Sequence, residues 1–193
     1  MSNYHTQIQE IIEKRRIRKL VHFTRITNLK SIIDYGILPK TEIERRKIKV
    51  DYNDQARKDN WLEATSVSVT EKNLFLFPRY IERAKSKEND WIDILISTNI
   101  LTEKECVFCY TNAANHNFDK FRENKLFLKN PNAFEDMFKY KVESSDYRQP
   151  IIRINQKDNK TTDNQAEICV FGIIEKKYFI NLKEIEDIIE KNG

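Results

Sequence analysis

The chain has 193 residues, of which 39% are hydrophobic, and this apolar content is sufficient for the core of one domain. Its net charge of +4 allows a nucleic-acid partner without requiring one. No apolar run approaches the roughly 20 residues of a membrane span, the N-terminus lacks the apolar core of a signal peptide, and three cysteines cannot make a disulfide framework. We therefore expect residues 1–193 to form a single domain in the reducing cytoplasm, without a membrane partner.

The first predicted element is an amphipathic helix over residues 4–18, with isoleucines at helical spacing. It ends in the basic run KRRIRK, residues 14–19. Such a run is either the solvated end of a helix or a contact to nucleic acid, and the sequence leaves both open.

The next segment, LVHFTRITNLKSIIDYGILPK at 20–40, predicts a strand, a short helix and a turn. In a strand, His22 and Thr24 point to the same face because side chains alternate. Residues 28–35 have apolar side chains at helical spacing, and Gly36 is expected to end this helix as a left-handed C-cap. The histidine is either a satisfied structural residue or part of a binding site.

Further strands are expected from alternating or continuous apolar residues at 65–70, 90–98, 105–111 and 165–174. The isoleucine-rich strand at 90–98 is expected at the centre of a sheet. The segments 40–64 and 115–163 are polar, and helices are predicted at 132–139 and 183–190. The order of these elements indicates a mixed α+β fold.

Glycine is scarce, with only Gly36, Gly172 and Gly193 in the chain. The dinucleotide fingerprint G-x-G-x-x-G and the P-loop both need clustered glycines. Neither motif can occur here, so a nucleotide would have to be held by another architecture.

Two charged residues are candidates for a functional site. Glu167, in NQAEICVF, interrupts the start of a buried strand, where a carboxylate is costly unless a partner or ligand compensates it. It could also face solvent at the mouth of the strand. Arg57 lies in a polar loop between Asp54 and Asp59, and its planar fork suits a phosphate or the edge of a nucleobase. A surface salt bridge with one of these aspartates is the alternative.

The cysteines do not predict a metal site. Cys106 and Cys109 have zinc-like spacing in CVFC, but no second pair exists, and Cys169 and His116 are poorly spaced partners. All three cysteines lie in apolar strands, as core residues do, so a Cys–His nucleophile pair is not expected either.

Five stretches occur in a characteristic order: HFTRITNLKSIIDYGILP, NDQARKDNWLEATSVSVTEKN, WIDILI, FCYTNAAN and DNQAEICVFGII. Together they resemble the DarT family, toxin ADP-ribosyltransferases that use NAD to modify bases in DNA. The resemblance extends from about Val21 to Ile174. Residues 115–163 match the family least.

The resemblance implies an ADP-ribosyltransferase-like fold, in which two small antiparallel sheets with flanking helices form an NAD cleft. This agrees with the missing glycine motifs. By this analogy His22 forms a hydrogen bond with the adenosine-side ribose of NAD, and Thr24 contacts the NAD backbone or the nicotinamide side. The residues that the resemblance places at the cofactor are His22, Phe23, Thr24, Gly36, Leu38 and Arg57.

The resemblance also implies the catalytic residues. Glu167 falls at the family's catalytic glutamate, where a carboxylate stabilises the oxocarbenium-like ribose as nicotinamide leaves. Arg57 falls at the catalytic arginine. Because a guanidinium stays protonated, we expect Arg57 to hold the diphosphate or polarise a base carbonyl.

The second substrate implied by the family is a nucleobase, which must be unstacked, so single-stranded DNA is expected. An antitoxin that reverses the modification is the expected partner. Two other functions remain open: transfer to RNA, protein or water, and a non-enzymatic nucleic-acid-binding module that would not need Glu167. Candidate stacking and phosphate-binding residues are Phe75, Phe77, Tyr80, Phe118, Phe121, Arg79, Arg83, Lys120 and Arg122.

Overall fold

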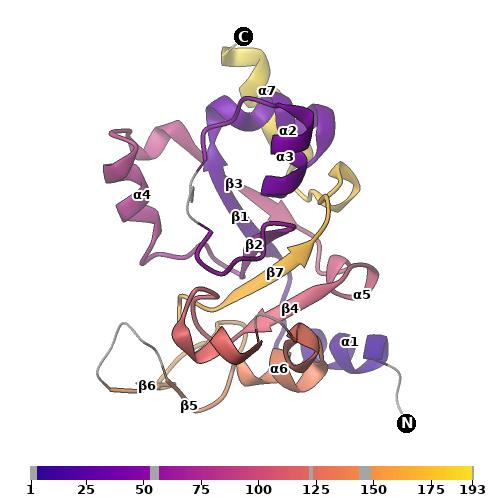
Figure 1. Cartoon of the computed structure of the whole chain (residues 1–193), viewed down its shortest axis with the longest axis vertical. Helices are drawn as coiled ribbons and strands as arrows, with labels where there is room; N and C mark the ends of the chain where they lie inside the picture. Colours follow the sequence, from indigo (N-terminus) through magenta and orange to yellow (C-terminus); the bar gives the residue numbers. More distant parts are fainter. Residues whose placement is uncertain (1–3, 53–56, 122–123, 144–148, 193) are drawn as a thin grey trace.

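A computed structural model describes residues 4–52, 57–121, 124–143 and 149–192 of the chain. Its centre is a five-stranded antiparallel sheet in the order β3-β1-β2-β7-β4, accompanied by a two-stranded sheet of β5 and β6 (Figure 1). The strands are β1 (Leu20–Arg25), β2 (Ala64–Val69), β3 (Trp91–Ile96), β4 (Cys106–Cys109), β5 (Lys141–Val142), β6 (Ile151–Ile152) and β7 (Glu167–Phe171).

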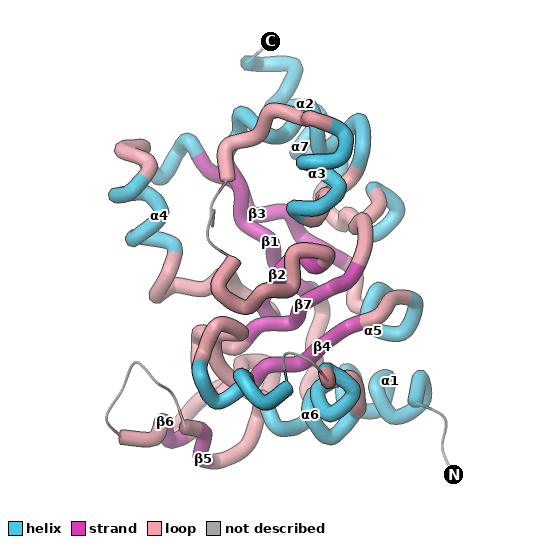
Figure 2. The backbone as a smooth tube through the Cα atoms, viewed as in Figure 1, coloured by secondary structure: helices cyan, strands magenta, loops and turns pink. Residues whose placement is uncertain are grey.

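Helices cover both ends of the central sheet. Figure 1 shows α2, α3 and α7 at one end and α1 and α6 at the other, while α4 lies at the side (the tube in Figure 2 shows the same arrangement). The mixed α+β fold is thereby confirmed. The helices are α1 (Tyr4–Lys14), α2 (Leu29–Tyr35), α3 (Lys40–Arg46), α4 (Phe77–Arg83), α5 (Ile100–Glu103), α6 (Pro131–Asp136) and α7 (Leu182–Asn192).

The sheet consists of two halves that meet at a short contact. In one half β1 pairs with β3 along its whole length, and in the other β7 pairs with both β2 and β4. Strands β1 and β2 pair with each other at Leu20–Val69 and Val21–Ser68. The two small antiparallel sheets that the resemblance implied correspond to these two halves, which are joined into one five-stranded sheet. Beyond the contact the two strands diverge.

Strand β3 corrects one prediction, because it lies at an edge of the sheet and not at its centre. The segment 178–181 covers that edge. The Ser97 amide donates to the Tyr178 carbonyl (2.8 Å), and the Ile180 amide donates to the Leu95 carbonyl (2.7 Å). The isoleucine-rich composition therefore reflects burial under this segment and not a central position.

The basic run after α1 is divided between two environments. The helix ends at Lys14, earlier than predicted, and Arg16 has a φ of +53°. Lys14 and Arg15 both contact Glu135 of α6, at 2.6 and 2.7 Å. Arg16 and Arg18 are exposed. Part of the run thus attaches α1 to α6.

Three short helices, α3, α4 and α5, were not predicted. Helix α3 has no buried residue, and its Glu42 forms ion pairs with Arg45 and Arg46 at 2.8 Å. Apolar periodicity cannot reveal a helix that buries no face. In α4 the apolar periodicity is similarly weak, because Phe77 is the one buried residue of this helix.

The buried residues form a large core and a smaller cluster that contains Trp61, Cys109, Phe118 and Cys169. All three cysteines are buried and free, as expected of core residues. Phe118 and Phe77 are 0% and 4% exposed. The prediction that these two rings are stacking platforms is wrong, because a ring inside the core has no face accessible to a base.

Among the described residues, no group of three or more His, Cys, Asp and Glu side chains is placed to hold a metal ion. None of the helices described is long and apolar enough to span a membrane.

Gly36 ends α2 in a conformation that differs from the prediction. Its φ of +81° is positive as expected, but its ψ is −177°, so it is not a left-handed C-cap. Its amide donates to the Ile32 carbonyl at 2.8 Å, and the next residue, Ile37, exchanges backbone hydrogen bonds with Ile174. A Cβ at Gly36 would lie 2.6 Å from the Ile174 carbonyl oxygen.

Replacing Gly36 by alanine should therefore destabilise the fold more than the same change at Gly172. Gly172 has a φ of +78° but no atom within 4 Å of an added Cβ, so it isolates the conformational strain. We expect Gly172→Ala to cost about 1–2 kcal/mol of unfolding free energy, and Gly36→Ala about 1 kcal/mol or more beyond that. Urea unfolding of both variants measures the difference. Equal losses would contradict a close approach at Gly36.

Candidate active site

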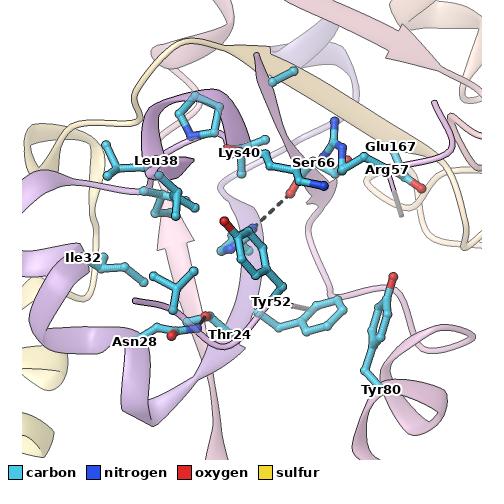
Figure 3. Close-up of a pocket in the computed structure, with 18 of the residues that line it drawn as sticks. Thr24, Asn28, Ile32, Leu38, Lys40, Tyr52, Arg57, Ser66, Tyr80 and Glu167 are labelled. Atoms are coloured by element: carbon cyan, nitrogen blue, oxygen red, sulfur yellow. Dashed lines mark hydrogen bonds between the residues drawn. The ribbon is translucent and has the colours of Figure 1, made fainter. Parts of the chain in front are cut away.

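A cavity of about 210 Å³ lies where β1 and β2 diverge. Its walls come from β1, α2, the turn that follows α2, residues 50–52, β2 and the first residue of β7 (Figure 3). The structure brings together here all the residues that the sequence placed at the cofactor and at the reaction, namely His22, Phe23, Thr24, Gly36, Leu38, Arg57 and Glu167.

His22 connects the two diverging strands. Its Nδ1 lies 3.1 Å from the backbone carbonyl oxygen of Ser66 in β2. Because a carbonyl can only accept, Nδ1 carries the proton, and Nε2 is the acceptor nitrogen of the neutral ring. Burial lowers the pKa of His22 below its usual value, and the positive charge of Arg57 lowers it further. The imidazole is therefore neutral at physiological pH.

Thr24 and Asn28 join β1 to the far wall of the pocket. The Asn28 side-chain amide donates to the Thr24 hydroxyl (3.1 Å) and to the Asp51 carbonyl (3.0 Å). The Asp51 amide in turn donates to Asn28 Oδ1 at 2.8 Å. Both polar side chains are buried, so these bonds compensate the loss of water. They also hold residues 51–52 against the pocket.

Phe23 belongs to an aromatic cluster beside the pocket. Its ring centroid lies 5.3 Å from that of Phe77, 5.8 Å from that of Tyr80 and 6.1 Å from that of Trp91. These separations are typical of favourable aromatic contacts. The cluster attaches α4 to the first half of the sheet and positions Tyr80 at the pocket.

Arg57 is held by its neighbours in a position where it still lines the pocket. Its Nε donates to Asp59 Oδ1 (3.2 Å), and one Nη donates to the Trp61 carbonyl (2.8 Å). The predicted alternative, an ion pair with an aspartate, is thus present. However, the side chains of Arg57 and Asp59 are only 12% and 6% exposed, so this is not a surface salt bridge. Asp54 lies outside the described residues.

Glu167 is a buried carboxylate, 8% exposed, at the first position of β7. Figure 3 shows it on the same side of the pocket as Arg57 and Ser66. Burial raises the pKa of Glu167 from 4.5 to about 7, and the charge of Asp59 adds to the rise. The Ser66 hydroxyl, the Arg57 charge and the Ala113 backbone oppose it. The carboxyl therefore changes charge near neutral pH.

Asn112 is a pocket residue whose role sequence reasoning missed. Its side-chain amide donates to Glu167 Oε1 at 2.5 Å, and its Oδ1 accepts from the Ala114 amide at 2.9 Å. It lies in the TNAAN stretch, one of the five motifs, but the motif alone did not indicate a partner 55 residues away. Other polar pocket residues that were not predicted are Asp51, Tyr52, Ser66, Ser68 and Asn73.

A buried hydrogen bond supports the position of Asn112. The Thr111 hydroxyl donates to Asp163 Oδ2 at 2.6 Å, and neither residue is exposed. Asp163 Oδ1 also accepts from the Gln165 amide at 2.8 Å. The segment that leads into Glu167 is therefore tied to the segment that carries Asn112.

The antiparallel sheet is split by a pocket, with a buried glutamate on one side, a neutral histidine on the other and no glycine-rich phosphate loop. This is the arrangement of an ADP-ribosyltransferase. The DarT family model, described as ssDNA thymidine ADP-ribosyltransferase, matches residues 21–185. The chain belongs to this family, as the motifs predicted. The family model describes an enzyme, so the non-enzymatic binding module that the sequence left open is not what this family represents.

Among solved structures, Thermosipho africanus DarTG in complex with ADP-ribose is similar to this chain, with a TM-score of 0.54 and 18% sequence identity. The match covers 91% of this chain and 48% of that chain, so this chain spans about half its length. At this identity the similarity establishes the fold. A comparison with curated proteins found no match.

The raised pKa of Glu167 predicts a pH-dependent effect of Glu167→Gln on stability. Below pH 4.5 the carboxyl is protonated in the folded and in the unfolded chain, so no charge is buried on folding. This advantage to the folded state is lost as the pH rises from 4.5 through about 7. Above that pH, burying the charge costs about 3 kcal/mol. Glu167→Gln should therefore gain about 2–3 kcal/mol more, relative to the native chain, at pH 8 than at pH 5.

Urea unfolding at the two pH values measures this gain. The control is Glu186→Gln on α7, which removes the same charge from an exposed position. The same stability change at both pH values for Glu167→Gln would contradict a buried carboxyl that titrates near neutrality.

Proposed function

We propose that this chain transfers ADP-ribose from NAD to thymidine in single-stranded DNA, with Glu167 and Arg57 at the reaction centre. The observation that carries the proposal is that the buried Glu167 carboxylate, Arg57 and the neutral His22 line one cavity. The family to which the chain belongs supports the acceptor. The roles of the individual residues follow from their geometry.

His22 is suited to bind a ribose hydroxyl of NAD. With its Nδ1 proton committed to Ser66, Nε2 can accept the hydroxyl hydrogen. Thr24 lies two residues further along the same strand and adds a hydroxyl to this wall. Phe23, Gly36 and Leu38 supply apolar surface, and the absence of a side chain at Gly36 allows the turn to lie close to Ile174, which follows β7.

The reaction breaks the bond between ribose C1′ and the nicotinamide nitrogen, and the electron pair leaves with nicotinamide. Positive charge then develops on the ribose, and the Glu167 carboxylate stabilises it. The thymine ring nitrogen that bears a hydrogen attacks C1′ and loses its proton. With a pKa near 7, Glu167 is suited to accept that proton.

Arg57 has a different task, because a guanidinium remains protonated and cannot act as a base at physiological pH. A hydrogen bond from Arg57 to a thymine carbonyl would withdraw charge from the adjacent ring nitrogen and ease loss of its proton. Contact with the NAD diphosphate is the second task that this position allows. Asp59 and Trp61 hold the side chain for either role.

The biological setting is part of the same proposal. Residues 1–193 would act as one transferase domain in the cytoplasm, where NAD and DNA are both present, and modification of DNA would make the chain a toxin. An antitoxin that removes the ADP-ribose would then be its partner. The similar DarTG structure contains ADP-ribose, which is the group that the proposed reaction transfers.

The proposal is tested by incubating the chain with NAD and single-stranded oligonucleotides that differ only in whether they contain thymidine. Mass spectrometry should find one added ADP-ribose on strands with thymidine, and annealing the complement should suppress the reaction because the base is then stacked. In Glu167→Gln the transfer rate should fall about 100-fold or more. Its affinity for NAD should change little, because the carboxylate acts mainly on the developing charge.

Glu186→Gln serves again as the control and should transfer at the native rate, since it lies on α7 outside the pocket. Modification of strands irrespective of thymidine would contradict the proposed acceptor. Near-native transfer by Glu167→Gln would contradict the catalytic role of the carboxylate.

A further inference from the structure

Helix α4 extends the pocket wall onto the surface of the molecule. Asn73 and Leu76, which precede the helix, and Tyr80 within it all line the pocket. In Figure 3 Tyr80 lies at the margin of the lining residues, apart from Ile32 and Leu38. Figure 1 shows α4 projecting from the side of the sheet, away from α1.

Two arginines on this helix lie over aromatic rings. The Arg79 guanidinium is 3.6 Å from the centre of the Phe75 ring, and that of Arg83 is 5.6 Å from the centre of the Tyr80 ring. Both arginines are exposed. A guanidinium stacked on a ring is held in place while its outer face stays accessible.

Neither arginine forms an ion pair with the acid on its own helix, Glu82. No ion pair joins Arg79 or Arg83 to a carboxylate in the part of the chain that the structure describes. Elsewhere arginines do have such partners, as Arg45 has in Glu42 and Arg15 has in Glu135. The exposed Lys85 and Lys87 follow directly after α4 and add positive charge. Residues 79–87 thus carry four cations against one carboxylate, Glu82, and this surface is electropositive.

Rings beside unbalanced cations suit one kind of ligand in particular. A single nucleic-acid strand presents bases that stack on aromatic side chains and phosphates that attract arginines, in alternation. A duplex hides the faces of its bases, and an acidic peptide would use the arginines without the rings.

We propose that α4 and the residue Phe75 before it bind the nucleotides next to the target thymidine. Tyr80, at the edge of the pocket, stacks on a flanking base, and Arg79 and Arg83 bind the phosphates. The phenyl ring of Phe75 holds Arg79 in position. This inference rests on the proposed transfer to single-stranded DNA and specifies the path of the strand outside the pocket.

The test compares Arg79→Gln/Arg83→Gln with the native chain in binding and transfer to a single-stranded 12-mer that contains one thymidine. Loss of two phosphate contacts should raise the Kd at about 0.1 M salt roughly tenfold, and should flatten the slope of log K against log salt by ~1.4. The loss in transfer should fall on KM for the strand and not on kcat. Tyr80→Leu should also raise the Kd about tenfold, because a stacking surface is removed.

The matched control is Arg16→Gln/Arg18→Gln, which removes two exposed arginines from the other basic segment of the chain. It should leave the Kd and the salt slope within about twofold of native. A native Kd and slope in Arg79→Gln/Arg83→Gln, or equal weakening in both double variants, would overturn the α4 site. Strand binding that depends on Arg79 and Arg83, without any transfer by the native chain, would support the α4 site and refute the proposed function.

Discussion

The burial of one carboxylate is the constraint on which the rest of this molecule depends. Glu167 begins β7, the strand that lies between β2 and β4, and it pairs with Cys109 of β4, while the next residue, Ile168, also pairs with Val67 of β2. A buried charge is costly, and here Asn112 and the neighbourhood of Arg57 offset part of the cost while the pKa still rises to about 7. The part of the cost that is not offset can be relieved by a positive charge that appears in the pocket. In the proposed reaction, the ribose acquires such a charge as nicotinamide leaves.

The pocket itself follows from how little of β1 pairs with β2. The two strands meet beside Leu20 and Val21, and past that point the His22–Ser66 hydrogen bond spans the gap between them. A cofactor can therefore enter between two halves of one sheet, with side chains as its walls. A glycine-rich loop is not needed, so a chain with three glycines can form a cleft of this kind. Helix α4, held by the aromatic cluster around Phe23, borders the same opening.

The sequence predicted those parts whose signal is local. The apolar runs predicted the strands of the central sheet but not β5 and β6, and the family motifs named residues that the structure places around one cavity, although their roles remain predictions. It could not reveal that β3 is an edge strand, because the segment that covers β3 lies 80 residues further along the chain. Burial decided against Phe77 and Phe118 as stacking platforms, while Lys120 and Arg122 fall where the structure gives no side-chain description. Asn112 was missed for the reason that applies to β3: its partner is distant in sequence.

The most direct test of the central claim is the pH dependence of kcat/KM for NAD in the transfer reaction, which reports ionisations of the free enzyme. If the ionised Glu167 stabilises the ribosyl cation, kcat/KM should rise about tenfold per pH unit below pH about 7 and level off above it. His22 titrates at lower pH, since burial lowers its pKa, and so leaves this inflection to the carboxyl. A profile that is level from about pH 5.5 to 8.5 would contradict the claim, because the charge of the buried carboxylate would then not matter to the reaction.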